Sequence, residues 1–266
     1  MKRADKGAEP ASLQTYRLAQ PTATWDDLRN DALFGGQKAY KDIRTHTHAD
    51  QGGVCAYCEI DVGNDDPLKS RIEHFHPKAD TSTPMNWALD WPNMLAVCLG
   101  GSYRHGTAPH TLEPLASNLS CDAHKDLLIQ QGHLLSACEG WVINPLLLPG
   151  SPCLFRVDKF TGELYPHGDH CAAVAAWPGN MHADLPALVV HTITVLNLNC
   201  PRLCAARLAV VHDIERNKKK MAALKLKPEE GLARLAQRYL QHRWPAFVTT
   251  IRSCLGAAAE ARMAAM

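Results

Sequence analysis

Two groups of chemically capable residues lie close together between positions 54 and 80. The first is the Cys-x-x-Cys pair of Cys55 and Cys58 in VCAYCE, and the second is Glu73-His74 in IEHFHPK. A Cys-x-x-Cys pair on a tight turn can place two thiolates on one tetrahedral zinc ion, at about 2.3 Å. A thiol-disulfide enzyme is the alternative, but it requires the pair to follow a strand and open a helix, a setting that this sequence does not supply.

A closed zinc site needs two further ligands. The candidates are Cys98 and Cys121, which lie farther apart than the second pair of an ordinary zinc ribbon. Spacing alone therefore leaves Cys138, His105 and His110 open as substitutes.

Glu73 and His74 could carry out a different kind of chemistry. Near a bend in the chain, the carboxylate can bind a divalent cation while the neutral imidazole takes a proton from water. A single Glu-His pair is more often a surface feature, so its context matters. Here Asn93 follows, and the run CDAHK at positions 121–125 adds further polar groups.

Composition limits the class of protein. The chain has 266 residues, of which 46% are hydrophobic, so it can bury a core. It has ten cysteines but no secretory signal, which favours reduced thiols and metal ligands over disulfides. No apolar run is long enough to span a membrane, so we expect a cytoplasmic protein without membrane contact. The six cysteines outside the four candidate ligands are predicted to be small buried residues.

Charge gives little indication of a partner. The net charge of +1 is not that of a generally basic nucleic-acid-binding protein, so contact with nucleic acid would need a local patch or a partner's surface. A local excess of lysine and arginine occurs in residues 201–243. We interpret most of this excess as a solvated helix face.

The N-terminal part is expected to contain two short helices. The first 20 residues lack periodicity and are predicted to form an extended arm. Thr24-Trp25-Asp26-Asp27 predicts a capping box that opens a helix, and Gly35-Gly36 is expected to close it after Phe34. A second helix is predicted from about Gln37 to Thr47 and is expected to end before Gly52-Gly53.

Later elements are predicted from their periodicity. Short apolar stretches occur around residues 71–75 and 94–98, and residues 141–166 suggest a loop and two strands joined by a turn at Thr161-Gly162. Residues 184–199 fit either a helix or a strand. A helix is predicted from Pro201, and a last amphipathic helix from about Glu229 is expected to break near Pro245.

The order of these motifs resembles a known family. Cys-x-x-Cys, Glu-His, Asn, Cys and Cys-Asp-x-x-Lys, with the phrases DWPNML, INPLLLP and TVLNLN, resemble the HNH endonucleases with a ββα-metal core. The chain is most similar to the PtuB family of the Septu and retron-associated anti-phage defence systems. The resemblance touches most of the first 200 residues.

The resemblance implies a role for each matching residue. His74 would be the general base, Asn93 would orient its imidazole, and Glu73 would help to bind Mg²⁺ or Mn²⁺. Asp122 directly follows the last cysteine and aligns with the third motif residue, while His124 would complete a literal HNH, and both remain open. The expected phosphate contacts are Lys125, Arg71 and His76, where His76 replaces the arginine common in relatives.

The resemblance also implies an architecture and partners. Cys55, Cys58, Cys98 and Cys121 become the structural zinc set. The implied fold class is α+β, with a small zinc-stapled ββα-metal HNH core embedded in a mainly helical chain. The expected divisions are an N-terminal arm with short helices at 1–50, the nuclease core at 51–135, and a mainly helical C-terminal region at 136–266.

The implied function is hydrolysis of nucleic acid in anti-phage defence, under control of a PtuA-like ATPase. DNA is the favoured substrate and RNA remains open. The long segment 99–120 is expected to be a loop, although Tyr103, Arg104 and His105 could reach the substrate. The alternative function is a non-catalytic, zinc-stapled protein-interaction module, which would have no need of Glu73, His74 and Asn93.

Overall fold

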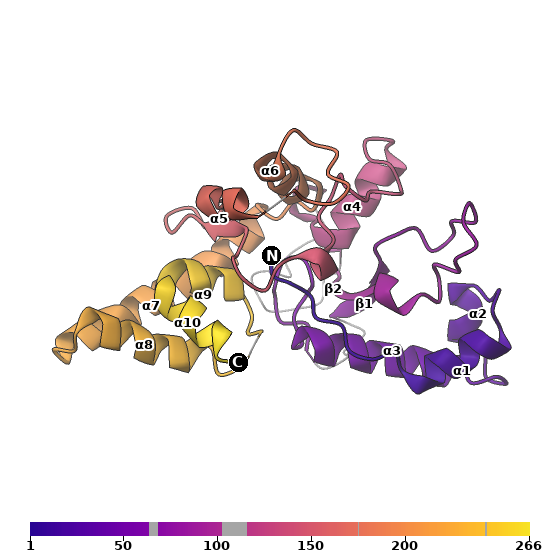
Figure 1. The fold of residues 1–266 in the computed structure, drawn as a ribbon, viewed down its shortest axis with the longest axis horizontal. Helices are drawn as coiled ribbons and strands as arrows, with labels where there is room; N and C mark the ends of the chain where they lie inside the picture. Colours follow the sequence, from indigo (N-terminus) through magenta and orange to yellow (C-terminus); the bar gives the residue numbers. More distant parts are fainter. Residues whose placement is uncertain (64–68, 103–115, 175, 243) are drawn as a thin grey trace.

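The computed structural model describes residues 1–63, 69–102, 116–174, 176–242 and 244–266, and it shows an elongated molecule (Figure 1). The N-terminal helices lie at one end and the C-terminal helices at the other. Between them lie a small β-hairpin, the helix that follows it and a second pair of short strands. The described structure is therefore a mixture of helices with two small sheets.

Three helices form the N-terminal group: α1 (Ala11–Ala19), α2 (Trp25–Asn30) and α3 (Gly36–Gln51). Both α1 and α2 pack on α3, and the three bury a common apolar cluster that includes Leu13, Leu28 and Ile43. The predicted capping box is confirmed. The Thr24 side chain accepts a hydrogen bond from the Asp27 amide, and the Asp27 carboxylate accepts one from the Thr24 amide.

Several predicted boundaries in this region are wrong. Residues 11–19 form a helix that begins directly after Pro10 and do not continue an extended arm. Helix α2 ends at Asn30, before Phe34, because the Asp31 carboxylate accepts amide hydrogens from Leu33, Phe34 and Gly36 and folds the chain into a turn. Helix α3 runs beyond Thr47 to Gln51.

The two apolar stretches after the Cys-x-x-Cys turn form the predicted strands. β1 (Ser70–His74) pairs antiparallel with β2 (Met94–Cys98), and Glu73 lies opposite Leu95. A short 3₁₀ turn, Trp91–Asn93, leads into β2. Helix α4 (Cys121–Gln130) packs against β2, so a β-hairpin and a helix come together in the middle of the molecule (Figure 1).

The second strand pair is also confirmed. β3 (Phe155–Val157) and β4 (Leu164–Pro166) are antiparallel and are joined by the turn that contains Gly162. After α5 (Gly168–Ala173), the ambiguous segment forms helix α6 (Leu185–Val195). The Asp184 carboxylate caps α6 by accepting a hydrogen bond from the Ala187 amide, which favours the helix over a strand.

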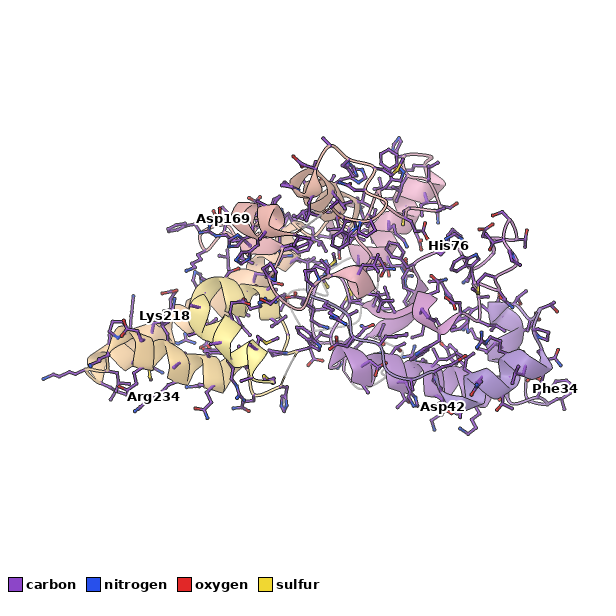
Figure 2. The ribbon with its side chains drawn as sticks, in the orientation of Figure 1. Phe34, Asp42, His76, Asp169, Lys218 and Arg234 are labelled. Carbon is purple, nitrogen blue, oxygen red and sulfur yellow. The ribbon has the colours of Figure 1, made fainter. Side chains whose placement is uncertain are left out.

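Four helices form the C-terminal group: α7 (Pro201–Ala223), α8 (Pro228–Tyr239), α9 (Val248–Leu255) and α10 (Ala257–Ala264). The helix predicted from Pro201 is confirmed. Helix α8 is the predicted amphipathic helix, but two helices follow it, so it is not the last. Lys218 and Arg234 extend from the α7–α8 hairpin at the end of the molecule (Figure 2). Most basic side chains of this region are exposed, but Arg202 and Arg207 are buried.

The largest apolar cluster joins distant parts of the chain. It contains Met1, Leu95, Leu188 and Phe247, so the N-terminus, the β-hairpin, α6 and the start of α9 share one core. The predicted domain boundaries near residues 50 and 135 stay predictions. None of the described helices is both long and apolar enough to cross a membrane.

Candidate active site and metal centre

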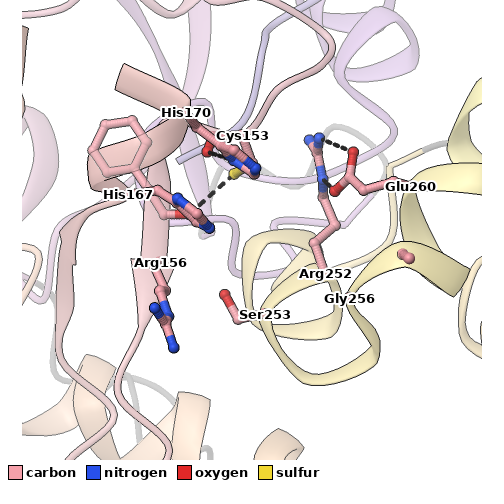
Figure 3. Close-up of a pocket in the computed structure, with 10 residues that line it drawn as sticks. Cys153, Arg156, His167, His170, Arg252, Ser253, Gly256 and Glu260 are labelled. Carbon is pink, nitrogen blue, oxygen red and sulfur yellow. Dashed lines mark hydrogen bonds and ion pairs between the residues drawn. The ribbon is translucent and has the colours of Figure 1, made fainter. Parts of the chain in front are cut away.

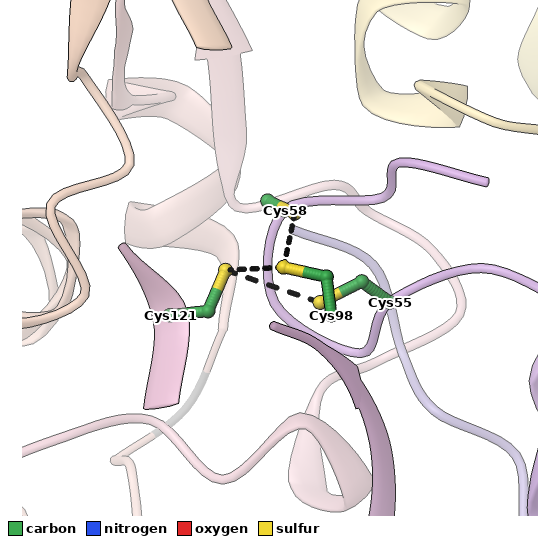
Figure 4. A group of neighbouring side chains, drawn as sticks. All are labelled: Cys55, Cys58, Cys98 and Cys121. Atoms are coloured by element: carbon green, nitrogen blue, oxygen red, sulfur yellow. Dashed lines mark hydrogen bonds between the residues drawn. The ribbon is translucent and has the colours of Figure 1, made fainter. Parts of the chain in front are cut away.

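Four buried cysteines meet at the centre of the molecule. The Sγ atoms of Cys55, Cys58, Cys98 and Cys121 all lie within 4.8 Å of one another (Figure 4). The separations are 3.9 Å between Cys55 and Cys121 and 3.7 Å for both Cys58–Cys98 and Cys98–Cys121. A tetrahedral zinc ion with Zn–S bonds of about 2.3 Å needs sulfur atoms roughly 3.8 Å apart. The cluster therefore fits one zinc ion.

Local backbone geometry turns the four sulfur atoms inward. Cys121 opens α4 with a left-handed φ of 56°, an uncommon conformation for a residue with a side chain. The Gly100 amide donates a hydrogen bond to Cys98 Sγ at 3.3 Å. A Cβ at Gly100 would lie 2.3 Å from the Ser120 carbonyl oxygen, so this close approach requires glycine.

A buried arginine from the C-terminal region lies beside this cluster. Arg202 of α7 donates hydrogen bonds to the Asn118 carbonyl, at 2.8 Å, and to the Ser120 hydroxyl. Burial opposes its charge, but the neighbouring cysteines, Cys98 first among them, raise the pKa of Arg202. Four thiolates around one Zn²⁺ carry two excess negative charges, which this guanidinium partly balances.

A second group of polar residues lines a cavity of about 360 Å³ between β1, the loop after it and α4. The structure brings together there Arg71, Glu73, His74, Asp122 and Lys125 of the predicted site. It does not bring Asn93, His76 or His124 to this cavity.

The carboxylates of Glu73 and Asp122 form the acidic part of the cavity, and both are buried. Lys125 forms an ion pair with Glu73, and Arg71 forms one with Asp122 at 2.5 Å. Burial and the nearby Asp122 carboxylate raise the pKa of Glu73 well above its usual range, against the effect of Lys125. The two cations predicted to touch phosphate therefore contact carboxylates.

This acidic pair fits a divalent cation. Asp122 Oδ1 is buried and has no hydrogen-bond partner among the described residues. An uncompensated buried carboxylate oxygen is costly, and Mg²⁺ and Mn²⁺ prefer such oxygen ligands. Within the described part of the chain, the four cysteines are the one group of three or more close ligand atoms. Glu73 and Asp122 alone would leave the other coordination positions of such an ion to water or substrate.

His74 is held in a defined orientation. Its Nε2 lies 3.1 Å from the Ala88 carbonyl oxygen, and because a carbonyl only accepts, Nε2 carries the proton and Nδ1 keeps a lone pair. The Trp25 ring of α2 packs edge-on against the imidazole at 4.6 Å. Burial lowers the pKa of His74 to about 4, so the ring is neutral near pH 7 and can accept a proton.

The role predicted for Asn93, to orient the His74 imidazole, stays a prediction, and the Asn93 side chain contacts the loop that holds the ring. The Asn93 side chain accepts a hydrogen bond from the His76 amide at 2.7 Å and donates to the carbonyls of His76 and Trp87, both at 3.0 Å. Trp87 precedes Ala88, whose carbonyl holds the imidazole. Asn93 therefore fixes the loop that orients His74, because all three of its hydrogen bonds go to the main chain of that loop.

Two other histidines point elsewhere. His124 Nδ1 donates to the Val195 carbonyl of α6 at 2.7 Å, so its ring faces the helical region. His76 lies between two carboxylates, with Nε2 2.8 Å from Asp80 and Nδ1 2.6 Å from Glu139. Burial opposes protonation, but these two acids raise the pKa of His76. Both ring nitrogens of His76 therefore contact carboxylates, and its predicted contact with phosphate stays a prediction.

Sequence reasoning missed two lining residues and Tyr57. Lys78 is exposed and lines the cavity beside His74. Asp126, one helical turn after Asp122, lies 3.9 Å from Arg71. The Tyr57 hydroxyl donates to Glu73 at 3.4 Å. Two sequence features could have indicated these residues. Lys78 belongs to the Pro-Lys pair after His76, and Asp126 lies four positions after Asp122, which places both aspartates on one face of α4.

Some expected candidates cannot be placed. Tyr103, Arg104, His105 and His110 lie outside the described residues. Of the remaining cysteines, Cys204 is half-buried and the other five are buried, as predicted. Cys138 is buried but does not belong to the four-sulfur cluster.

The comparisons give one strong similarity. No protein-family model matches the chain. The chain is 36% identical over 239 residues to a protein of Escherichia coli that is named as a candidate HNH endonuclease of retron Ec83. The aligned part covers 87% of this chain and 89% of the relative.

Proposed function

The chain belongs to the family of HNH endonucleases that this Escherichia coli relative represents, and we propose that it hydrolyses DNA with a divalent metal ion as the effector of a retron-type anti-phage system. The chain is accordingly a nuclease, and the alternative of a non-catalytic interaction module is set aside. The proposal takes the β-hairpin and α4 as the ββα-metal core of the nuclease.

The observation that carries the proposal is the content of the cavity between β1 and α4. It holds a neutral imidazole, fixed through the Ala88 carbonyl, and two buried carboxylates, one of which has an oxygen without a hydrogen-bond partner in the described part of the chain. A general base beside a divalent-ion site is the arrangement that phosphodiester hydrolysis needs.

In the proposed reaction, His74 Nδ1 takes a proton from the attacking water while Nε2 donates to Ala88. Glu73 and Asp122 would hold Mg²⁺ or Mn²⁺, which, when bound, stabilises negative charge on the phosphate and the leaving oxygen. Lys125 forms an ion pair with Glu73 and Arg71 forms one with Asp122, which partly offsets the cost of burying the two carboxylates. Lys78, exposed at the cavity and without an ion pair among the described residues, is the cation proposed to contact the phosphate backbone.

We further propose that the four cysteines hold structural zinc and that the chain is a PtuB-type nuclease controlled by a PtuA-like ATPase, as in Septu systems. The near-neutral net charge supports a partner that supplies part of the nucleic-acid surface. The proposed division is an arm at 1–50, a nuclease core at 51–135 and a partner-binding region at 136–266.

The test is cleavage by the purified chain, with and without a PtuA-like ATPase from the same organism. Labelled single- and double-stranded DNA and RNA are incubated with Mg²⁺ or Mn²⁺. The proposal predicts metal-dependent cleavage of DNA that the ATPase changes at least about tenfold. Cleavage of RNA in preference to DNA would contradict DNA as the proposed substrate. Cleavage at the same rate in a metal-chelating buffer would contradict the metal-dependent mechanism.

A further inference from the structure

A second cavity, of about 570 Å³, lies apart from the proposed active site. Its walls come from β3, the start of α5 and the corner between α9 and α10 (Figure 3). It shares no lining residue with the cavity between β1 and α4. A volume of this size accommodates a small organic ligand.

Of the two arginines that line this cavity, only Arg156 is available to bind an anionic ligand. Arg252 is buried and committed, because it forms a two-pronged ion pair with Glu260, at 2.6 and 2.7 Å, and also donates to the Gly150 carbonyl at 3.0 Å. Arg156 of β3 is exposed and has no carboxylate partner in the described part of the chain. With two arginines against one glutamate, the lining has a net charge of +1.

Two histidines add ring nitrogens to the lining of this cavity. The rings of His167 and His170 stack 3.5 Å apart and nearly parallel, at 5°. His170 Nδ1 donates to the Cys153 carbonyl at 2.8 Å, which leaves its Nε2 free of that bond. His167 Nδ1 is buried without a hydrogen-bond partner among the described residues. Burial, His170 and Arg156 lower the pKa of His167, as expected in cationic surroundings.

The remaining wall is apolar. Phe155, Gly256 and Ala257 line it, and the last two lie at the N-terminus of α10. The cavity is larger than one phosphate group needs. It combines imidazoles and an apolar surface with the Arg156 guanidinium, which lies 5.7 Å from the centre of the Tyr165 ring and has no carboxylate partner among the described residues. Guanidinium groups bind phosphate well, an imidazole N–H can donate a hydrogen bond to a phosphate oxygen, and an apolar wall suits an aromatic ring.

We propose that this cavity binds a nucleotide, with its phosphate between Arg156 and His167 and its base against the apolar wall. The chain would then carry a ligand site for a small phosphate-bearing molecule in its C-terminal half, separate from the site of phosphodiester hydrolysis. Nucleotide binding at this site does not depend on the proposed nuclease mechanism.

The test is isothermal titration calorimetry of the full zinc-loaded chain without added Mg²⁺. The probes are ATP, GTP, CTP and UTP, with the corresponding nucleosides and inorganic phosphate as controls. We expect at least one nucleotide to bind at least about tenfold more tightly than its nucleoside and than phosphate alone. Arg156→Gln and His167→Gln should each weaken this binding at least about tenfold.

The matched control is Lys159→Gln, which removes an exposed cation from the adjacent turn that does not line the cavity. It should bind the nucleotide as the wild type does. The nuclease variant His74→Ala should also bind normally, which separates this site from the catalytic one. The proposal is overturned if no nucleotide binds at about 1 mM, if nucleosides bind equally well, or if Arg156→Gln binds like the control.

Discussion

The roles of Asp122 and His124 depend on which way each side chain leaves α4. Two positions apart on a helix, the side chains differ in direction by roughly 200°, so they face opposite sides. Asp122 faces β1 and the cavity, whereas His124 donates to α6. The sequence left both residues open because each side chain could bind a metal ion. Which of them faces the cavity depends on the residue at which α4 begins, and the sequence does not give that position.

We predict that Asp122→Asn lowers the rate of cleavage at least about 100-fold, since it removes a charged oxygen ligand of the divalent ion. His124→Gln should change the rate less than about threefold and cost about 1 kcal/mol of stability, the value of one hydrogen bond. Rates are measured at several Mg²⁺ concentrations with one DNA substrate. A larger loss for His124→Gln than for Asp122→Asn would reverse the assignment.

The pH dependence of cleavage should report His74 and Glu73 separately. The pKa of His74 is lowered to about 4, so the base stays neutral and active at pH 5, and activity is lost only as the pH falls toward 4. The pKa of Glu73 is raised, so protons compete with the metal ion at this carboxylate as the pH falls. If the loss of cleavage rate at low pH shifts to still lower pH when Mg²⁺ is increased, that loss reports protonation of Glu73.

The measurement is kcat/KM between pH 4.5 and 8 at low and saturating Mg²⁺. At saturating Mg²⁺ we expect at least half of the maximal rate to remain at pH 5.5. A metal-independent loss with a midpoint near 6.5, the ordinary value of histidine, would show that the base is not the buried imidazole described here.

At the scale of elements, the four-cysteine cluster joins the Cys-x-x-Cys turn, the end of β2 and the start of α4. Removing one ligand should therefore loosen three elements at once. We predict that Cys98→Ser abolishes zinc binding and costs at least about 5 kcal/mol, a fraction of the ~10–16 kcal/mol with which structural zinc binds. For a chain of this size the melting temperature falls by roughly 10–20 °C.

Zinc content is measured by elemental analysis and unfolding by calorimetry. Cys204→Ser is the matched control, because this half-buried cysteine lies outside the cluster. It should keep one zinc per chain and melt within a few degrees of the wild type. Full zinc content in Cys98→Ser would contradict the four-cysteine assignment.

The elements themselves were partly predictable. Local signals such as the Thr24 capping box, the Gly162 turn and Pro201 in the first turn of α7 were sufficient, because each acts within a few residues. Element ends were less predictable where a side chain redirects the backbone, as Asp31 does after α2. The contacts of Asn93 in the site were unpredictable for a similar reason. Its three hydrogen-bond partners are main-chain groups, and the sequence does not show where the main chain runs.

At the scale of the whole molecule, the C-terminal region supports the metal centre. Arg202 reaches from α7 to the segment before Cys121, and Thr249 of α9 donates two hydrogen bonds to the Glu59 carboxylate, at 2.9 and 2.5 Å. These contacts join residues far apart in the sequence, and periodicity carries no information about them. Sequence analysis interpreted most basic residues of 201–243 as a solvated face, because an arginine on a long helix is usually exposed, and it did not single out Arg202.

We predict that Arg202→Met destabilises the chain by about 3 kcal/mol, because it leaves the charge of the zinc-thiolate cluster uncompensated and the Asn118 carbonyl unpaired. Zinc should also be released to a chelator more quickly than from the wild type. The neighbouring Arg216→Met, which removes an exposed arginine from the same helix, should change neither quantity. If the two variants have the same stability and release zinc at the same rate, Arg202 does not stabilise the four-cysteine cluster.

The central claim, that His74 is the base of a nuclease, is tested most directly by DNA cleavage with purified His74→Ala. The account predicts a loss of at least about 1,000-fold in rate, with zinc content and melting temperature close to those of the wild type. Cleavage by this variant at the wild-type rate, with zinc bound and the fold intact, would contradict the account.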